Sequence, residues 1–171
     1  MRLIIIGAGG YGRVVADIAA QSGEYNEICF LDDNCNDACV LGKCADFPSF
    51  VDEHTEFYVA FGNNELRMKF INSLIDIGAK IATVIHKTAY ISPLAKIDVG
   101  TAVLPNSVVN TNVVVNKGVI INCGAVVDHD CIIGEGTHIC INTVIKAENN
   151  IPALTKVDAG VVIENRQYPI K

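Results

Sequence analysis

Isoleucine or valine occupies every sixth position from residue 85 to residue 163. These fourteen positions are Ile85, Ile91, Ile97, Val103, Val109, Val115, Ile121, Val127, Ile133, Ile139, Ile145, Ile151, Val157 and Ile163. A helix has a period of 3.6 residues and a flat strand a period of two, so neither explains a period of six. A hexapeptide repeat is typical of a parallel β-helix. Each hexad would form one short side and point its Ile or Val toward the axis, and three sides would make a coil of about eighteen residues.

Small residues stand four positions after many of these sites, where a tight corner between two sides requires them. They are Ala95, Thr101, Ser107, Ala125, Cys131, Thr137 and Thr143. Fourteen hexads then make between four and five coils. We therefore predict a β-helix over residues 83–171.

Residues 1–82 follow a different pattern, in which strand-like runs alternate with helix-like runs. The predicted strands are RLIIIG, EICFLDD, EFYVAFG and roughly residues 80–84. The predicted helices are residues 10–21 with a face of Val14, Val15, Ile18 and Ala19, a short helix at PSFVDEH, and NNELRMKFINSLIDIG with a face of Leu66, Phe70, Leu74 and Ile77. Such alternation predicts a parallel sheet with right-handed crossovers. The fold class is therefore α/β plus β, with a small Rossmann-like βαβ domain at residues 1–82 followed by the β-helix.

Composition narrows the class of protein. Half of the 171 residues are apolar and the formal net charge is −6, which argues against a nucleic-acid binder. The longest apolar runs are too short to span a bilayer, and the N-terminus reads as a first strand rather than a signal peptide. We expect a cytoplasmic protein without membrane insertion.

The seven cysteines fit reduced, buried or loop thiols, because their number is odd and no C-x-x-C occurs. Four of them lie between residues 29 and 44, but their spacing matches no zinc pattern. We expect no metal.

The segment GAGGYG has the G-x-G-x-x-G spacing between a strand and a helix, and Asp32 and Asp33 follow about twenty residues later. Glycines let a phosphate approach the backbone at a helix N-terminus. Some eighty residues with four strands cannot supply the second half of an NAD site, so one nucleotide half suits a sugar nucleotide better. A tight turn without any ligand is the alternative.

The segment VVDHDCIIGEGTHIC places two histidines among residues that suit a packed sheet. Alternation would put His129 on the same face as Val127, whereas a corner would turn it outward. A histidine beside carboxylates can accept a proton near neutral pH, but it can also be an ordinary surface residue. His138 is nine residues further, half a coil away, so a shared site would need a neighbouring subunit.

The combination of GAGGYG, FLDD, FGNNELR and DHDCIIGEGTHIC resembles the NeuD/PglD-type acyltransferases, bacterial enzymes that acetylate sialic acid or UDP-linked amino sugars. The resemblance covers essentially the whole chain. It implies a left-handed β-helix, acetyl-CoA as co-substrate, a homotrimer, and active sites between adjacent β-helices.

The resemblance also implies roles for individual residues. His129 would be the general base, Asp130 would orient it, His138 would lie near the acetyl group of the donor, and Asn122 would border the sugar. The nucleotide-sugar contacts would be Gly7, Gly9, Gly10, Tyr11, Gly12, Asp32, Asp33, Gly62, Asn63 and Asn64.

Three features depart from the family pattern. The family often has His at the position of Tyr11 and usually has Glu at that of Asp130, and it has about one more coil after His138. Basic residues that could meet the phosphates of CoA are Lys146, Lys156, Arg166 and Lys171.

We expect an acetyl-CoA-dependent transferase of glycan biosynthesis that N-acetylates a UDP-linked amino sugar. O-acetylation of sialic acid or another sugar is the nearest alternative. A nicotinamide oxidoreductase, a γ-class carbonic anhydrase and a non-catalytic nucleotide-sugar-binding scaffold are alternatives of other classes.

Overall fold

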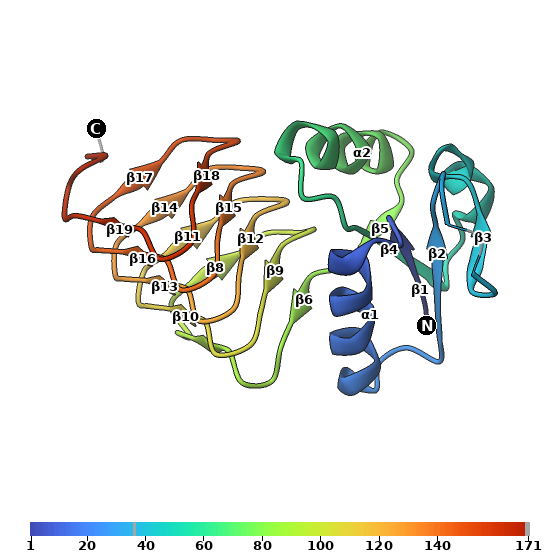
Figure 1. Cartoon of the computed structure of the whole chain (residues 1–171), viewed down its shortest axis with the longest axis horizontal. Coiled ribbons are helices and arrows are strands. Elements are labelled where there is room, and N and C mark those ends of the chain that lie inside the picture. Colours follow the sequence, from blue (N-terminus) through green and yellow to red (C-terminus); the bar gives the residue numbers. More distant parts are fainter. Residues whose placement is uncertain (36, 170–171) are drawn as a thin grey trace. The chain divides into compact units, whose positions relative to one another are not determined.

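The computed structural model describes residues 1–35 and 37–169. The chain divides into two compact units, Met1–Ala82 and Thr83–Lys171 (Figure 1). None of the helices in the described ranges combines the length and the apolar character that a membrane span requires.

The first unit is a five-stranded parallel sheet in the order β3-β2-β1-β4-β5. Its strands are β1 (Arg2–Ile6), β2 (Glu27–Leu31), β3 (Val40–Gly42), β4 (Thr55–Val59) and β5 (Lys80–Ile81). Its helices are α1 (Gly10–Ser22), the 3₁₀ helix η1 (Cys44–Phe50) and α2 (Asn64–Asp76). The central strand β1 is fully buried from Leu3 to Ile6, as an unbroken apolar run in a parallel sheet requires.

The strand order reverses between β1 and β4. The loop from β1 to α1 and the loop from β4 to α2 therefore both lie at the carboxyl edge of the sheet, beside each other. In open parallel sheets this reversal is the usual place for a ligand.

Four details of the first unit differ from the sequence-based prediction. The strand β3 was not predicted, because three residues carry too little periodicity. The short helix expected at residues 48–54 lies earlier, at Cys44–Phe50, and is a 3₁₀ helix. The strand expected at residues 80–84 ends at Ile81, and Val84–Ile85 form the first strand of the second unit. Val14 is 42% exposed, so α1 packs through Gly12, Val15, Ile18 and Ala19 instead.

The packed face of α2 was predicted in part, because Leu74 is fully buried and Phe70 packs against the core of the first unit. The buried face consists of Arg67, Met68, Ile71 and Leu74. Leu66 and Ile77 are 39% and 44% exposed. The physical reason is Arg67, which is fully buried because its guanidinium donates to Phe61 O (2.8 Å) and Asn64 Oδ1 (2.9 Å). A hydrophobic pattern cannot anticipate an arginine that is buried through hydrogen bonds.

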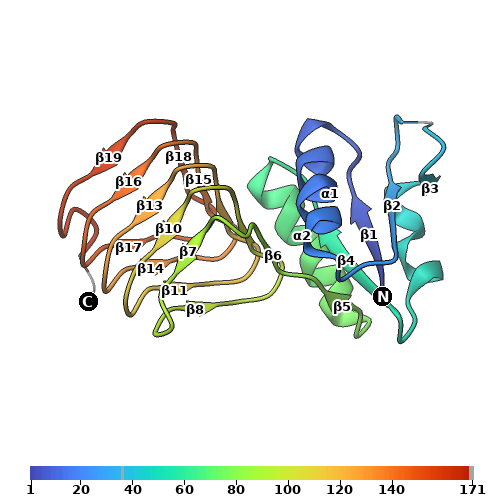
Figure 2. The same cartoon turned by 90° about the horizontal axis from the view of Figure 1, so that it is seen from below.

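The second unit is a parallel β-helix of stacked coils, whose strands form three parallel sheets along its sides (Figure 2). Its two-residue strands are β6 (Val84–Ile85), β7 (Tyr90–Ile91), β8 (Lys96–Ile97), β9 (Ala102–Val103), β10 (Val108–Val109), β11 (Val114–Val115), β12 (Ile120–Ile121), β13 (Val126–Val127), β14 (Ile132–Ile133), β15 (His138–Ile139), β16 (Val144–Ile145), β17 (Asn150–Ile151), β18 (Lys156–Val157) and β19 (Val162–Ile163). Each strand pairs with the strand one coil away, so that Val109 lies beside Ile91 and Val127. The coil length is therefore the eighteen residues that the hexads predict.

The hexad positions form the axis of the coil. From Val103 onward all of them are buried in one continuous cluster, together with small residues of the corners such as Ala125 and Cys131. Ile91 and Ile97 are partly buried and Ile85 is 44% exposed. These three belong to β6, β7 and β8, the edge strands of their sheets, which have a neighbouring coil on one side only.

Candidate functional site

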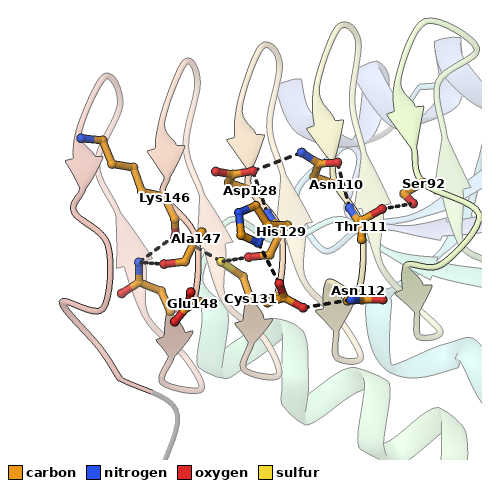
Figure 3. Close-up of polar contacts among 12 residues, drawn as sticks. Ser92, Asn110, Thr111, Asn112, Asp128, His129, Cys131, Lys146, Ala147 and Glu148 are labelled. Carbon is orange, nitrogen blue, oxygen red and sulfur yellow. Dashed lines mark hydrogen bonds and ion pairs between the residues drawn. The ribbon is translucent and has the colours of Figure 1, made fainter.

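His129 lies at a corner of the β-helix, between β13 and β14 (Figure 3). The next residue, Asp130, has a left-handed backbone with φ 57°, which ends the strand direction and turns the chain. The side chain of His129 is 48% exposed, whereas Val127 is fully buried. The corner therefore directs the imidazole to the surface instead of into the packed axis.

Asp130 is the direct partner of the imidazole. His129 Nδ1 lies 2.7 Å from Asp130 Oδ2, so the shorter Asp side chain reaches the ring. The hydrogen bond to Asp130 raises the pKa of His129, and the charges of Asp128, Asp130 and Glu148 raise that pKa further. The hydrogen bonds from His129 and Asn112 lower the pKa of Asp130. An Nδ1–H that donates to an ionised carboxylate leaves Nε2 as the nitrogen that can accept a proton.

Asp128 forms a hydrogen bond with the backbone of His129 rather than with its ring. Its Oδ1 accepts the backbone N–H of His129 (2.8 Å) and Nδ2 of Asn110 (3.1 Å). Asp128 thus fixes the corner, while Asp130 contacts the imidazole.

His138 and Asn122 lie on another side of the coil. His138 is the outward residue of β15, and its Nε2 lies 3.0 Å from Asn122 Nδ2. Because an amide nitrogen can only donate, Nε2 of His138 is the acceptor in this pair. The structure brings these two predicted residues together, and it places them on a different sheet from the corner of His129.

The glycines of the first unit fall into two groups. Gly7 has φ +108°, and a Cβ on Gly12 would lie 2.0 Å from Gly7 O, so both glycines are required by the turn itself. A Cβ on Gly9, Gly10 or Gly62 would meet no atom within 4 Å. Packing within the chain therefore does not explain these three glycines, whereas a ligand lying against the backbone would.

The two helices that begin at this edge differ in how their N-termini are satisfied. In α2 the N-terminal residue Asn63 caps the helix, since its side chain accepts the N–H of Leu66 at 2.9 Å. Asn64 Oδ1 accepts a hydrogen bond from Arg67. Gly9 provides no such cap for α1. The N-terminus of α1 therefore offers backbone N–H groups to an anion.

The side chains of the remaining predicted nucleotide contacts form hydrogen bonds within the first unit. Asp32 Oδ2 accepts the N–H of Ala8 at 2.7 Å, and its Oδ1 accepts those of Asn34 and Cys35. The hydrogen bond from Ala8, followed by those from the next turn, lowers the pKa of Asp32. Asp33 Oδ1 accepts Cys44 N at 2.9 Å. The hydroxyl of Tyr11 lies 2.6 Å from that of Tyr58, and burial raises the pKa of Tyr11. Asp32 thus holds the glycine loop in place.

A shallow pocket of about 240 Å³ lies beside Asp32. It is lined by Asp32, Cys35, Asp37, Val40, Leu41, Gly42 and Lys43. It opens at the end of β2, next to the loop that Asp32 holds.

Two of the four basic residues considered for a phosphate are ion-paired within the β-helix. Lys146 Nζ lies 2.5 Å from Glu164 Oε2, and Arg166 Nε lies 2.6 Å from Glu148 Oε2. Lys156 is exposed, and Lys171 lies outside the described residues. Within residues 1–35 and 37–169, no three His, Cys, Asp or Glu side chains group as metal ligands. All seven cysteine thiols are free.

Sequence reasoning missed the residues that support the corner of His129 from neighbouring coils. Asn110 and Asn112 precede Asp128 and Asp130 by eighteen residues, and Glu148 follows Asp130 by eighteen. Counting one coil in either direction from the DHD segment would have found them.

Comparisons with known proteins match a family model to the first unit and solved structures to nearly the whole chain. The family model of the PglD N-terminal domain matches residues 2–74. The chain is similar to the acetyltransferase domain of PglB from Neisseria gonorrhoeae FA1090, with 34% identity over 96% of this chain and 83% of that chain and a TM-score of 0.93.

Two ligand-bound structures are also similar. The same PglB domain in complex with acetyl coenzyme A has 31% identity over 94% of each chain and a TM-score of 0.79. A mutant of perosamine N-acetyltransferase from Caulobacter crescentus, in complex with CoA and GDP-perosamine, has 27% identity over 96% of this chain and 89% of that chain, with a TM-score of 0.84. These likenesses and the stacked parallel sheets fit a left-handed β-helix.

Proposed function

Since this chain belongs to the NeuD/PglD-type family of sugar acetyltransferases, we propose that it transfers the acetyl group of acetyl-CoA to the amine of a nucleotide-linked amino sugar. The observation that carries the proposal is the exposed His129, with Nδ1 held 2.7 Å from Asp130. The relatives bind acetyl-CoA, or CoA with GDP-perosamine, which supports the thioester donor and the sugar-nucleotide acceptor.

The proposed chemistry follows from the His129–Asp130 pair. Nε2 of His129 accepts a proton from the sugar amine as the amine attacks the thioester carbon. The Asp130 carboxylate stabilises the imidazolium that forms. The tetrahedral intermediate then breaks its C–S bond, and the proton passes from His129 to the leaving thiolate. A base of this kind is useful because the attacking nitrogen must lose a proton to become an amide nitrogen, and the leaving thiolate must gain one.

We assign the nucleotide to the carboxyl edge of the first unit. Gly9, Gly10 and Gly62 leave the backbone accessible there, and the uncapped N-terminus of α1 favours a diphosphate. The pocket beside Asp32 is of a size for a base or ribose. We propose a UDP-linked sugar as the acceptor, and a panel of nucleotides tests this, because the Caulobacter relative holds a GDP-linked one.

We also propose a homotrimer. In one sheet of the β-helix, the outward residue of every strand is aliphatic or aromatic, namely Tyr90, Val108, Val126, Val144 and Val162. Tyr90 and Val162 are 55% and 47% exposed. A continuous apolar ladder of this kind suits burial against another copy. We propose that a ring of such contacts brings the His138 of one copy toward the His129 of its neighbour. Within a single chain the two histidines lie on different sides of the coil.

The free thiols fit a reducing compartment, and we place the protein in the cytoplasm.

The test is His129→Ala, assayed by CoA thiol release with acetyl-CoA and UDP-, GDP- and CMP-linked amino sugars. We expect kcat to fall by about 10²- to 10⁴-fold, the typical contribution of a positioned base. His86→Ala is the matched control, because Nδ1 of His86 bonds to the hydroxyl and the backbone N–H of Thr88 and has no role in the proposed reaction. Unchanged turnover in His129→Ala would refute the base. A wild-type protein that binds the sugar nucleotide without turnover would indicate a scaffold instead.

A further inference from the structure

Asn112 contacts the partner of the imidazole from the preceding coil. Asn112 Nδ2 donates to Asp130 Oδ1 at 3.0 Å, while Asp130 Oδ2 faces His129 Nδ1 at 2.7 Å. The backbone of Asp130 is held separately, because its N–H donates to Thr111 O at 3.0 Å. Each oxygen of the Asp130 carboxylate thus has one fixed neighbour.

This arrangement matters because Asp130 is not enclosed. Its side chain is 46% exposed, so water competes for both oxygens. A carboxylate with one anchored oxygen has fewer orientations available, and the other oxygen then stays directed at the ring.

Asn110 provides an internal contrast. It belongs to the same corner and also donates to an aspartate of the next coil, but its partner is Asp128, which binds the backbone N–H of His129. The two asparagines thus make similar contacts, but only the partner of Asn112 also contacts the imidazole of His129.

The carboxylates that raise the pKa of His129 lie on this corner, in its own coil and the next one. Asp128, Asp130 and Glu148 act on His129, and Arg166 pairs with Glu148 one coil further. Asn112 is neutral, so its removal changes the orientation of a carboxylate without changing the charge around the ring.

We propose that Asn112 is a positioning residue for the base: it anchors Asp130 Oδ1 so that Oδ2 stays on His129 Nδ1. This rests on the proposed function only where turnover is concerned. The effect on the imidazole itself can be measured without any substrate.

A purely structural role for Asn112 is the competing explanation. Its backbone has φ 58°, a conformation that asparagine adopts more readily than most residues. The corner residues Asp130, Glu148 and Arg166 share this conformation. A variant must therefore keep the turn and remove only the amide.

Asn112→Gly meets this requirement, because glycine adopts positive φ without strain. Asn106→Gly is the matched control, since Asn106 has φ 59° at a different corner, between β9 and β10. The primary readout is an NMR titration of the four imidazoles in the wild type and both variants, with the signal of His129 assigned by its loss in His129→Gln. The pKa of His129 should fall by roughly 0.3 to 1 unit in Asn112→Gly and stay unchanged in Asn106→Gly, because the raising hydrogen bond is populated less.

Turnover is the second readout. Asn112→Gly should lose about 3- to 30-fold in kcat at the pH plateau, with little change in the KM of either substrate and a melting temperature equal to that of Asn106→Gly. An unchanged or raised pKa of His129, or equal shifts in both variants, would overturn the inference. A lowered pKa in a protein that shows no acetyl transfer would keep the positioning role and reject the proposed function.

Discussion

At the scale of single residues, His129 acquires its chemistry from its immediate neighbours. Val127 is packed into the axis, and two residues later the left-handed Asp130 turns the chain and exposes the imidazole. Asp130 then raises the pKa of His129 through a hydrogen bond. A base with a raised pKa is stronger, but it stays protonated up to a higher pH. The acid limb of the activity profile should therefore lie above the ordinary value for histidine, about 6.5.

Asp130→Asn tests this directly. With the carboxylate replaced by an amide, the pKa of His129 should fall, so the acid limb of kcat/KM should move to lower pH while the plateau rate drops. The measurement is kcat/KM against pH, which reports the ionisations of the free enzyme. Asp128→Asn is the comparison, since it removes a charge that also raises the pKa of His129 but keeps the hydrogen bond between Asp130 and the ring, so its acid limb should move less. A limb that stays in place in Asp130→Asn would show that Asp130 does not set the protonation of the base.

At the scale of elements, the loop from β1 to α1 contains glycines that packing requires and glycines that packing does not require. The turn from β1 to α1 needs Gly7 and Gly12, because α1 starts against the carbonyl of Gly7. Gly9 and Gly10 face open space in the same turn. The G-x-G-x-x-G segment thus contains two kinds of glycine. Gly7 and Gly12 are required by the fold, whereas Gly9 and Gly10 leave room beside the backbone for a proposed ligand.

Gly9→Ala and Gly12→Ala separate the two roles. In Gly12→Ala the new Cβ would lie 2.0 Å from Gly7 O, so the loop or the helix must move. The free energy of unfolding of the first unit should therefore fall by about 1–3 kcal/mol. Gly9 has φ −68° and ψ −175°, which alanine tolerates, so Gly9→Ala should keep the wild-type melting temperature. It should weaken sugar-nucleotide binding by about tenfold. Thermal unfolding and titration calorimetry check both, and equal behaviour of the two variants would contradict the assignment.

At the scale of the whole molecule, the outer surface of the β-helix differs between its sheets. The sheet of β7, β10, β13, β16 and β19 presents an apolar ladder, whereas the sheet of β8, β11, β14 and β17 carries Lys96 and Asn150 beside Val114 and Ile132. Only the first of these surfaces suits burial in an assembly.

Val144→Glu places a charge within the apolar ladder and should shift the proposed trimer to monomers. Val114→Glu introduces the same charge on the mixed sheet and should leave the assembly intact. Light scattering coupled to size exclusion measures both masses. Because the proposed site needs His138 of a neighbouring copy, turnover should fall with the mass of Val144→Glu. A wild-type monomer with full activity would contradict the proposal.

The sequence by itself determined the β-helix, because one side chain must fill the same axial position in every hexad and a period of six has no other common use. It also indicated the parallel α/β unit and the DHD and glycine segments. It did not reveal β3, the place of η1 or the burial of Arg67 in the packed face of α2, because a three-residue strand has no readable period and Arg67 is buried through hydrogen bonds.

The tertiary structure decided what the candidate residues contact. Whether His129 points outward depends on the backbone angle of Asp130, and its supporting residues come from coils eighteen positions away. Asn112 and Glu148 lie near His129 only because the coils stack in register. The eighteen-residue coil already indicates which residues lie one coil apart, but only the structure shows which of them bond to the DHD segment, because that depends on the backbone angles at the corner.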